Sequence, residues 1–260
     1  MEFFVIFNTI IMSLFTGGGF ILNNSLTNVI VNKSEEVGEV RVRVNSLPTH
    51  QLIKGEVDSI QVSLKQWQPR PHIQVELLEL EIDRVGVNLD QLRGLKADNW
   101  QNVLKTPLNM AWRSILTEED INKLMKSSQL QEMITKFTGD SASGFQLLDL
   151  SFNLQDNNRV GIDSKVKLPI RGDEILNVSL EFNLEVIKGH SITISEVEGT
   201  LNNRKLSSTL LQGFVDNINN QLSLRNLEKS GITVRLLQFN IDEDNLEIAG
   251  FVHLQPSKNE

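Results

Sequence analysis

The sequence contains no cysteine and no tyrosine, and it has only four histidines in 260 residues. The absence of cysteine excludes disulfide bonds, thiolate catalysis and cysteine-ligated zinc. The histidines are scattered, and none belongs to a recognisable Ser-His-Asp arrangement; they are His50, His72, His190 and His253. An enzyme is therefore a poor interpretation of this chain, and no cofactor or metal is expected.

Positive charge is also scarce, because 25 Lys and Arg residues face 33 Asp and Glu residues, for a net charge of −8. Binding to nucleic acid needs clustered Lys and Arg that neutralise phosphates. The sequence has no such cluster, so nucleic acid is not expected as a partner. The hydrophobic content of 40% is sufficient for a substantial core.

Charged side chains are missing altogether between Glu2 and Lys33. Residues 3–22 reach the length of about 20 residues that crosses a bilayer, but Asn8, Thr9 and three glycines weaken the drive for insertion. A secretory signal would begin with basic residues, and a helix in the membrane interface would usually carry Lys or Arg. We interpret residues 3–22 as an uncleaved helix that associates with a membrane. A signal peptide and a helix buried in the protein are the alternatives.

The chain after this segment alternates apolar and polar residues, which is typical of antiparallel sheet with one buried face. The clearest stretches are "VRVRV" (40–44), "IQVSL" (60–64) and "ILNVSLEFNLEV" (175–186). Helical spacing and capping residues predict helices after Leu22, after Thr117, after Ser127-Ser128 and after Ser207. "DEDN" (242–245) resembles a calcium loop, but Leu246 and Glu247 occupy the positions of a ligand and a glycine, so it is predicted to be a turn.

Three predicted strands share a double leucine in the middle: "VELLELEI" (75–82), "FQLLDLSF" (145–152) and "VRLLQFNI" (234–241). In a regular strand the Leu-Leu step would send half of the apolar residues to the wrong face. A β-bulge at that step restores one apolar face and bends the strand. We therefore predict three bulged strands; strands that are buried on both faces are the alternative.

The order of these elements predicts an α+β fold, with one strongly curved antiparallel sheet wrapped around helices. Residues 1–33 are expected to form the apolar helix and a following amphipathic helix, and residues 34–260 a single domain. Such a sheet can close over a solid core or leave an apolar tunnel.

Three stretches carry a resemblance to a known family: "EVRVRVNSLPTHQLIKGEVDSIQVSLKQW" (39–67), "LELEIDRVGVNLDQL" (78–92) and "LTEEDINKLM" (116–125). They contain a Pro48-to-Gly55 turn, a strand that leads from Leu78 to Asp90, and a Leu-Thr-Glu-x-Asp helix start. Together they resemble the LmeA family of phospholipid-binding proteins over nearly the whole chain. The resemblance implies a TULIP-like fold with an apolar tunnel, association with the cell envelope or an internal membrane, and no enzyme activity.

Two features depart from this family. The basic start of an export signal is missing, and the net charge is acidic, whereas binding an acidic phospholipid favours local positive charge. The hypothesis that follows is a non-catalytic phospholipid-binding or lipid-transfer protein, with a membrane-anchored scaffold that has a filled core as the alternative. The acyl chains are expected to contact Val42, Val62, Val75, Val178, Leu180, Phe182 and Phe214. The headgroup is expected near a basic patch of Arg41, Arg43, Lys54, Lys65 and Arg70.

Overall fold

The computed structural model describes residues 22–46, 51, 54–92, 100–127, 146–168 and 174–256. The predicted apolar helix over residues 3–22 lies outside this range except for Leu22, which begins helix α2. The helix predicted after Ser127-Ser128 also lies outside it, because Ser127 is the last residue described before residue 146.

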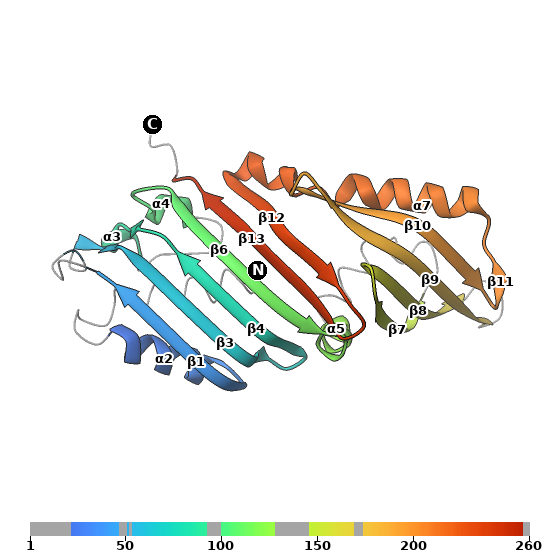
Figure 1. Ribbon diagram of the computed structural model, residues 1–260, viewed down its shortest axis with the longest axis horizontal. Coiled ribbons are helices and arrows are strands. Elements are labelled where there is room, and N and C mark those ends of the chain that lie inside the picture. The colour runs from blue at the N-terminus through green and yellow to red at the C-terminus, as the bar shows by residue number, and fades with distance from the viewer. Residues whose placement is uncertain are drawn as a thin grey trace.

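Two antiparallel sheets make up most of the described chain (Figure 1). The first sheet has six strands in the order β1 (Glu36–Asn45), β3 (Ser59–Arg70), β4 (Ile73–Ile82), β6 (Leu108–Thr117), β13 (Asn245–Leu254) and β12 (Ile232–Ile241). The second has five strands in the order β11 (Arg204–Lys205), β10 (Ser191–Leu201), β9 (Glu174–Ile187), β8 (Arg159–Leu168) and β7 (Gln146–Gln155).

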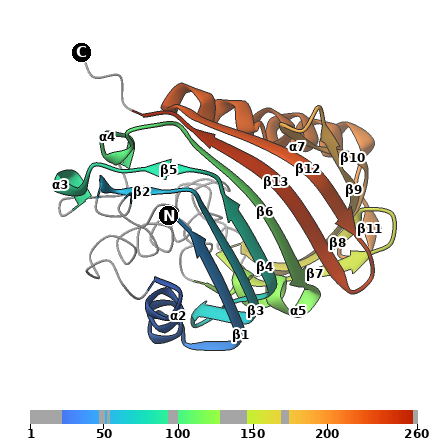
Figure 2. The same cartoon turned by 60° about the vertical axis from the view of Figure 1, so that its left-hand side comes forward.

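Short elements complete the fold. β2 (Glu56–Val57) and β5 (Val85–Gly86) form a two-stranded sheet at one end of the molecule (Figure 2). The helices are α2 (Leu22–Lys33), α3 (Leu89–Leu92), α4 (Trp100–Val103), α5 (Glu118–Met125), α7 (Ser208–Gln221) and the 3₁₀ helix η3 (Leu224–Ser230). The prediction of an α+β fold built on antiparallel sheet is confirmed, but the strands form separate sheets and not the single sheet that was expected.

Two of the three predicted bulges are present. The pairing of β12 with β13 shifts register between Leu236 and Gln238, and that of β7 with β8 shifts between Leu147 and Asp149. Each bulge keeps one apolar face on its strand and leaves the second leucine of the pair outside it, so that Leu237 is 73% exposed.

The bulge predicted at Leu77-Leu78 is wrong. Leu77 pairs with Lys65 and Leu78 with Leu64 in unbroken register, so the two leucines point to opposite faces of β4. The irregularity lies in the neighbouring strand instead, where Gln66 has a φ of 48° and the register shifts between Trp67 and Arg70.

The edge strand β12 of the first sheet joins that sheet to the second (Figure 1). The backbone N–H of Leu236 donates to Gly189 O in the β9–β10 turn at 2.7 Å. The N–H of Ile241 donates to the side-chain Oδ1 of Asn158 at 2.7 Å, and the N–H of Asn158 donates back to Ile241 O at 3.3 Å. Hairpin turns of the second sheet therefore form hydrogen bonds with backbone groups on the edge strand of the first sheet.

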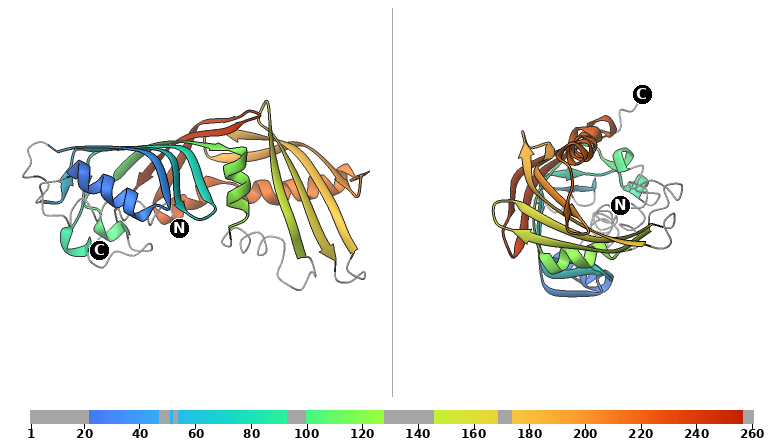
Figure 3. Two further views of the ribbon diagram at one scale, coloured as in Figure 1. Left: turned by 90° about the horizontal axis from the view of Figure 1, so that it is seen from below. Right: turned by 90° about the vertical axis from the view of Figure 1, so that its right-hand side faces the viewer.

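Helix α5 lies between the two sheets and covers the edge of β7 (Figure 3). It begins with the predicted N-cap Thr117, which forms a capping box with the buried carboxylate of Asp120. The side chain of Asn122 both accepts from the N–H of Phe152 and donates to its carbonyl, each at 2.8 Å. The amide of Asn122 thus takes the place of a neighbouring strand.

Asn122→Ala should lower the free energy of unfolding by about 1–3 kcal/mol, because it leaves both backbone groups of Phe152 without their partner. Urea denaturation followed by circular dichroism would measure the change. Asn226→Ala, at an exposed position in η3, is the control and should leave the stability unchanged. Equal stability of the two variants would mean that the hydrogen bonds between Asn122 and the backbone of Phe152 contribute nothing to stability.

Candidate functional site

The inner face of the second sheet carries rows of apolar side chains in register. Leu154, Val160 and Phe182 form a buried row across β7, β8 and β9, with exposed fractions of 4%, 3% and 8%. The next row consists of Phe152, Ile162 and Leu180, and these three side chains are only half-buried. Apolar surface is therefore still accessible beside a packed row.

Helix α7 packs beside this surface on β10 (Figure 1). Its residues Leu211 and Val215 are buried. Gly199 of β10 lies opposite Leu180, and a Cβ at Gly199 would stand 3.1 Å from Leu211 Cδ2 and 2.7 Å from Leu180 Cδ2. The missing side chain lets the helix approach the sheet at the end of the half-buried row.

The inner face of the first sheet is filled by its own side chains. Ile60, Ile82 and Leu108 of this sheet are 0% exposed, and so are Val57 and Val85 of the two-stranded sheet, which belong to the same core. The amphipathic helix α2 packs onto this core with two further buried residues, Leu26 and Ile30, so this helix belongs to the body of the protein.

The predicted acyl-lining residues therefore fall into two separate clusters. Val62 is buried in the core of the first sheet, and Val42 and Val75 are half-buried against that core. The three residues on the second sheet are in β9: Leu180 and Phe182 belong to its apolar cluster, and Val178 is half-buried on the same strand. Phe214 is in α7, but its side chain lies outside the described part of the structure. The sequence interpretation missed Phe152 and Ile162, although the alternation from Val160 to Val166 indicated that Ile162 faces inward.

The predicted basic patch is not gathered at one place. Arg41, Arg43 and Lys65 stand on the outer face of β1 and β3, opposite the apolar inner face. Lys54 precedes β2, before the start of β3, and Arg70 is the last residue of β3, so these two residues belong to opposite ends of that strand. Hydrogen bonds from Lys65 and Arg41 hold the pKa of the Glu39 carboxyl below its usual value.

A shallow hollow of about 610 Å³ lies on the outer face of the first sheet, between Arg41 and Arg43 on β1 and Arg113 on β6. Arg113 donates to Glu247 at 2.6 Å and to Glu79 at 3.2 Å. These two hydrogen bonds raise the pKa of the Arg113 guanidinium. Acidic side chains therefore pair with Arg113 and, through Glu39, with Arg41 on this face.

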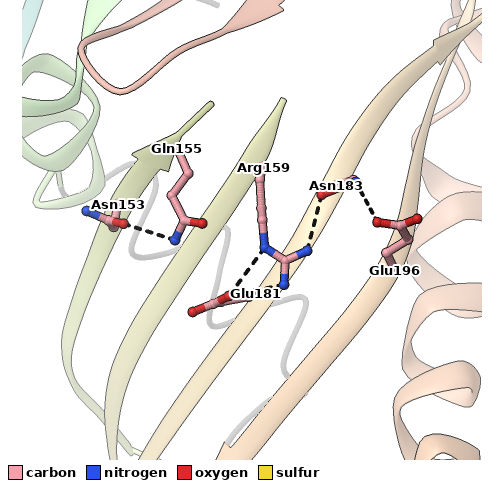
Figure 4. A network of polar contacts seen from close by, with 6 residues as sticks. All are labelled: Asn153, Gln155, Arg159, Glu181, Asn183 and Glu196. Carbon is pink, nitrogen blue, oxygen red and sulfur yellow. Dashed lines mark hydrogen bonds and ion pairs between the residues drawn. The ribbon is translucent and has the colours of Figure 1, made fainter. Parts of the chain in front are cut away.

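The outer face of the second sheet carries a network of polar contacts that runs across its strands (Figure 4). Arg159 on β8 donates to Glu181 at 3.1 Å and to Asn183 at 3.3 Å on β9, and Asn183 donates to Glu196 on β10 at 2.8 Å. Strands β8, β9 and β10 are thus linked by polar side chains on the face opposite their apolar residues, as the alternation predicts.

Within the described ranges, no group of three or more His, Asp or Glu side chains is placed to hold a metal ion. "DEDN" is a turn, as predicted: Asp242 Oδ1 accepts from the N–H groups of Asp244 and Asn245 between β12 and β13. Among the residues that the structure describes, no helix is long and apolar enough to cross a bilayer.

Comparison with curated proteins and with solved structures gives no match. The family model for LmeA-like phospholipid-binding proteins matches residues 16–251 of the 260. This match extends from the segment before α2 to β13 and includes both sheets. The chain therefore belongs to the LmeA-like phospholipid-binding family.

Proposed function

We propose that this protein binds phospholipid without catalysis and holds the acyl chains against the inner face of its second sheet. The observation that supports this placement is the half-buried apolar row of Phe152, Ile162 and Leu180. In this proposal the curved sheets and helices enclose an apolar tunnel of the TULIP type, with Val178 and Phe182 also in its wall.

The second sheet is preferred over the first because most of the apolar core of the first is buried, whereas an entire row across three strands of the second is half-buried. Val62 is 3% exposed and Ile60 is 0% exposed, so an acyl chain there would have to displace packed side chains. The half-buried side chains of the second sheet can instead exchange water for lipid.

Apolar contact alone is sufficient to hold a lipid against release into water. Burying one methylene group contributes about 0.8 kcal/mol, so ten buried methylenes of one acyl chain contribute roughly 8 kcal/mol. A strongly basic headgroup pocket is therefore unnecessary, which is compatible with the net charge of −8.

The basic residues of β1 and β3 have a different role in this proposal. Since Arg41, Arg43 and Lys65 face away from the apolar inner face, they contact the anionic surface of a membrane rather than the headgroup of the bound lipid. Residues 3–22 provide the apolar part of this membrane association.

Arg43→Gln combined with Lys65→Gln should reduce the preference of the full chain for anionic vesicles by roughly fivefold for each charge removed. Sedimentation with phosphatidylglycerol-containing and with pure phosphatidylcholine vesicles would give this ratio. Arg204→Gln combined with Lys205→Gln removes the same charge from β11 and should leave the ratio unchanged. Equal losses in both double variants would rule out the proposed orientation.

Transfer from labelled vesicles tests the binding function. The full chain is mixed with vesicles that contain a fluorescent phospholipid, then recovered by an affinity tag and extracted with organic solvent. We expect about one labelled phospholipid per chain. The filled core of the first sheet favours a second candidate, a membrane-anchored scaffold, and that function predicts recovery of the folded chain without lipid.

A further inference from the structure

The two large sheets have four borders, and specific contacts satisfy backbone groups on three of them; β10 forms one of these borders, because the short strand β11 pairs only with Thr200 and Leu201. Gly189 and Asn158 form hydrogen bonds with backbone groups of β12, and Asn122 does so with backbone groups of β7. On β10, Asn219 of α7 accepts from the N–H of Ile194 at 2.8 Å and donates to its carbonyl at 3.2 Å. Unpaired edges invite association with another strand, so these contacts protect the monomer from pairing at three sites.

The fourth edge is β1, which lies at the end of the molecule away from the second sheet (Figure 1). It is a strand of ten residues. In the part of the chain that the structure describes, β3 is the only strand that pairs with the backbone from Glu39 to Arg43. Helix α2 packs against β1, but among the described residues no strand lies on the other side of this stretch.

We propose that two copies of this chain associate through antiparallel pairing of their β1 strands. When two identical strands pair about a two-fold axis, every contact occurs twice: if one residue of the first copy contacts a second residue of the other copy, the second residue of the first copy contacts the first residue of the other. The side chains of β1 suit this arrangement, because Glu39 and Arg41 project outward on either side of the inward Val40.

The charges select one register. When Val40 lies on the two-fold axis, each Glu39 faces Arg41 of the other copy. Within one chain Glu39 already pairs with Arg41 and with Lys65, so this register places opposite charges of the two copies beside each other. An axis at Arg41 opposes the two Arg41 side chains, and an axis at Glu39 opposes the two Glu39 side chains. An axis at Val42 opposes Arg41 to Arg43. Among these four axes, only the one at Val40 opposes both charged pairs without repulsion.

Pairing in this register continues the first sheet from one copy into the other. The two-fold axis runs perpendicular to the sheet, so the apolar inner faces of both copies lie on the same side. Charged residues on an edge strand usually discourage pairing, but here their signs are complementary under the two-fold operation. The inference concerns assembly and does not depend on lipid binding.

Cysteine crosslinking tests this dimer, since the natural chain has no cysteine. In full chains in phosphatidylcholine vesicles, Val40→Cys should form an intermolecular disulfide on oxidation, because directly opposed residues have Cα atoms about 4.5–5.5 Å apart. Val42→Cys is the matched control, with its two copies about 13 Å apart along the strands. We expect at least about tenfold more crosslinked chain for Val40→Cys. Equal yields in folded proteins would overturn the proposal.

Charge variants in the Val40→Cys background test the register separately. Arg41→Glu brings carboxylates together across the axis and should reduce the crosslinked fraction by roughly fivefold. Adding Glu39→Arg to that chain again places opposite charges of the two copies beside each other and should restore crosslinking. An unchanged fraction in the Arg41→Glu chain, or no recovery in the combined chain, would overturn the proposed register.

Discussion

Replacing Leu180 with aspartate should abolish phospholipid retention by the folded protein. Leu180 lies in the half-buried row on the inner face of β9, where the proposed acyl chain would contact it. A carboxylate at this position would have to lose its water when lipid binds, and an unpaired buried charge costs several kcal/mol. The measurement is the amount of labelled phospholipid recovered per chain after incubation with vesicles.

Leu237→Asp is the matched control for that experiment. It makes the same chemical change at a bulge in β12 where the side chain is 73% exposed, so both folding and lipid retention should persist. Circular dichroism and thermal unfolding establish that the Leu180→Asp chain is folded. Normal lipid retention by a folded Leu180→Asp variant would exclude the inner face of β9 as the acyl site.

The second large effect concerns stability. Gly250→Ala in β13 should lower the free energy of unfolding by about 1–3 kcal/mol, which is typical of overpacking. A Cβ at Gly250 would lie 2.9 Å from Trp112 Nε1 and 2.9 Å from the backbone oxygen of Arg235. Because one of these neighbours is backbone of the adjacent strand, the clash cannot be relieved by moving a side chain alone.

Gly213→Ala provides the opposite result in the same assay. Gly213 lies inside α7, and no atom stands within 4 Å of a Cβ placed there. Alanine should therefore raise stability by about 0.5–1 kcal/mol, because glycine loses more conformational freedom in a helix. Thermal unfolding would compare both variants with the natural chain. A Gly250→Ala protein as stable as the natural one would show that Trp112 and β12 have room to move.

Local pattern predicted much of this fold. Period-two alternation identified the strands, and the Thr117 and Ser207 caps located α5 and α7. These features depend on residues only a few positions apart, so the sequence is sufficient to indicate them. The Leu236-Leu237 bulge was predictable for the same reason. The double leucine that breaks the alternation and the bulge that restores it lie in the same strand.

The Leu77-Leu78 step shows where a pattern in one strand is insufficient. It pairs regularly with Leu64 and Lys65, and the irregular backbone lies in the neighbouring strand at Gln66. The same limit applied to the site. Alternation indicated that Val62 and Leu180 face inward, but it could not assign them to separate clusters.

Contacts between distant segments also determined which residues of the candidate site lie together. Asn158 closes the edge of β12 at Ile241 across 83 positions of sequence, and this contact joins the two sheets. The basic residues appeared to form one patch because β1 and β3 are close in sequence. Their strands instead place Arg41 and Arg43 on the outer face and Arg70 at a strand end.

Native mass spectrometry of the full chain, released from non-ionic detergent micelles, tests the proposed function most directly. The full chain is needed because α2 contributes Leu26 and Ile30 to the core. We predict a population whose added mass corresponds to about one phospholipid, identified after extraction, and a loss of this population in Leu180→Asp. A folded chain that has only its own mass, and that takes up no phospholipid from added vesicles, would contradict the proposal.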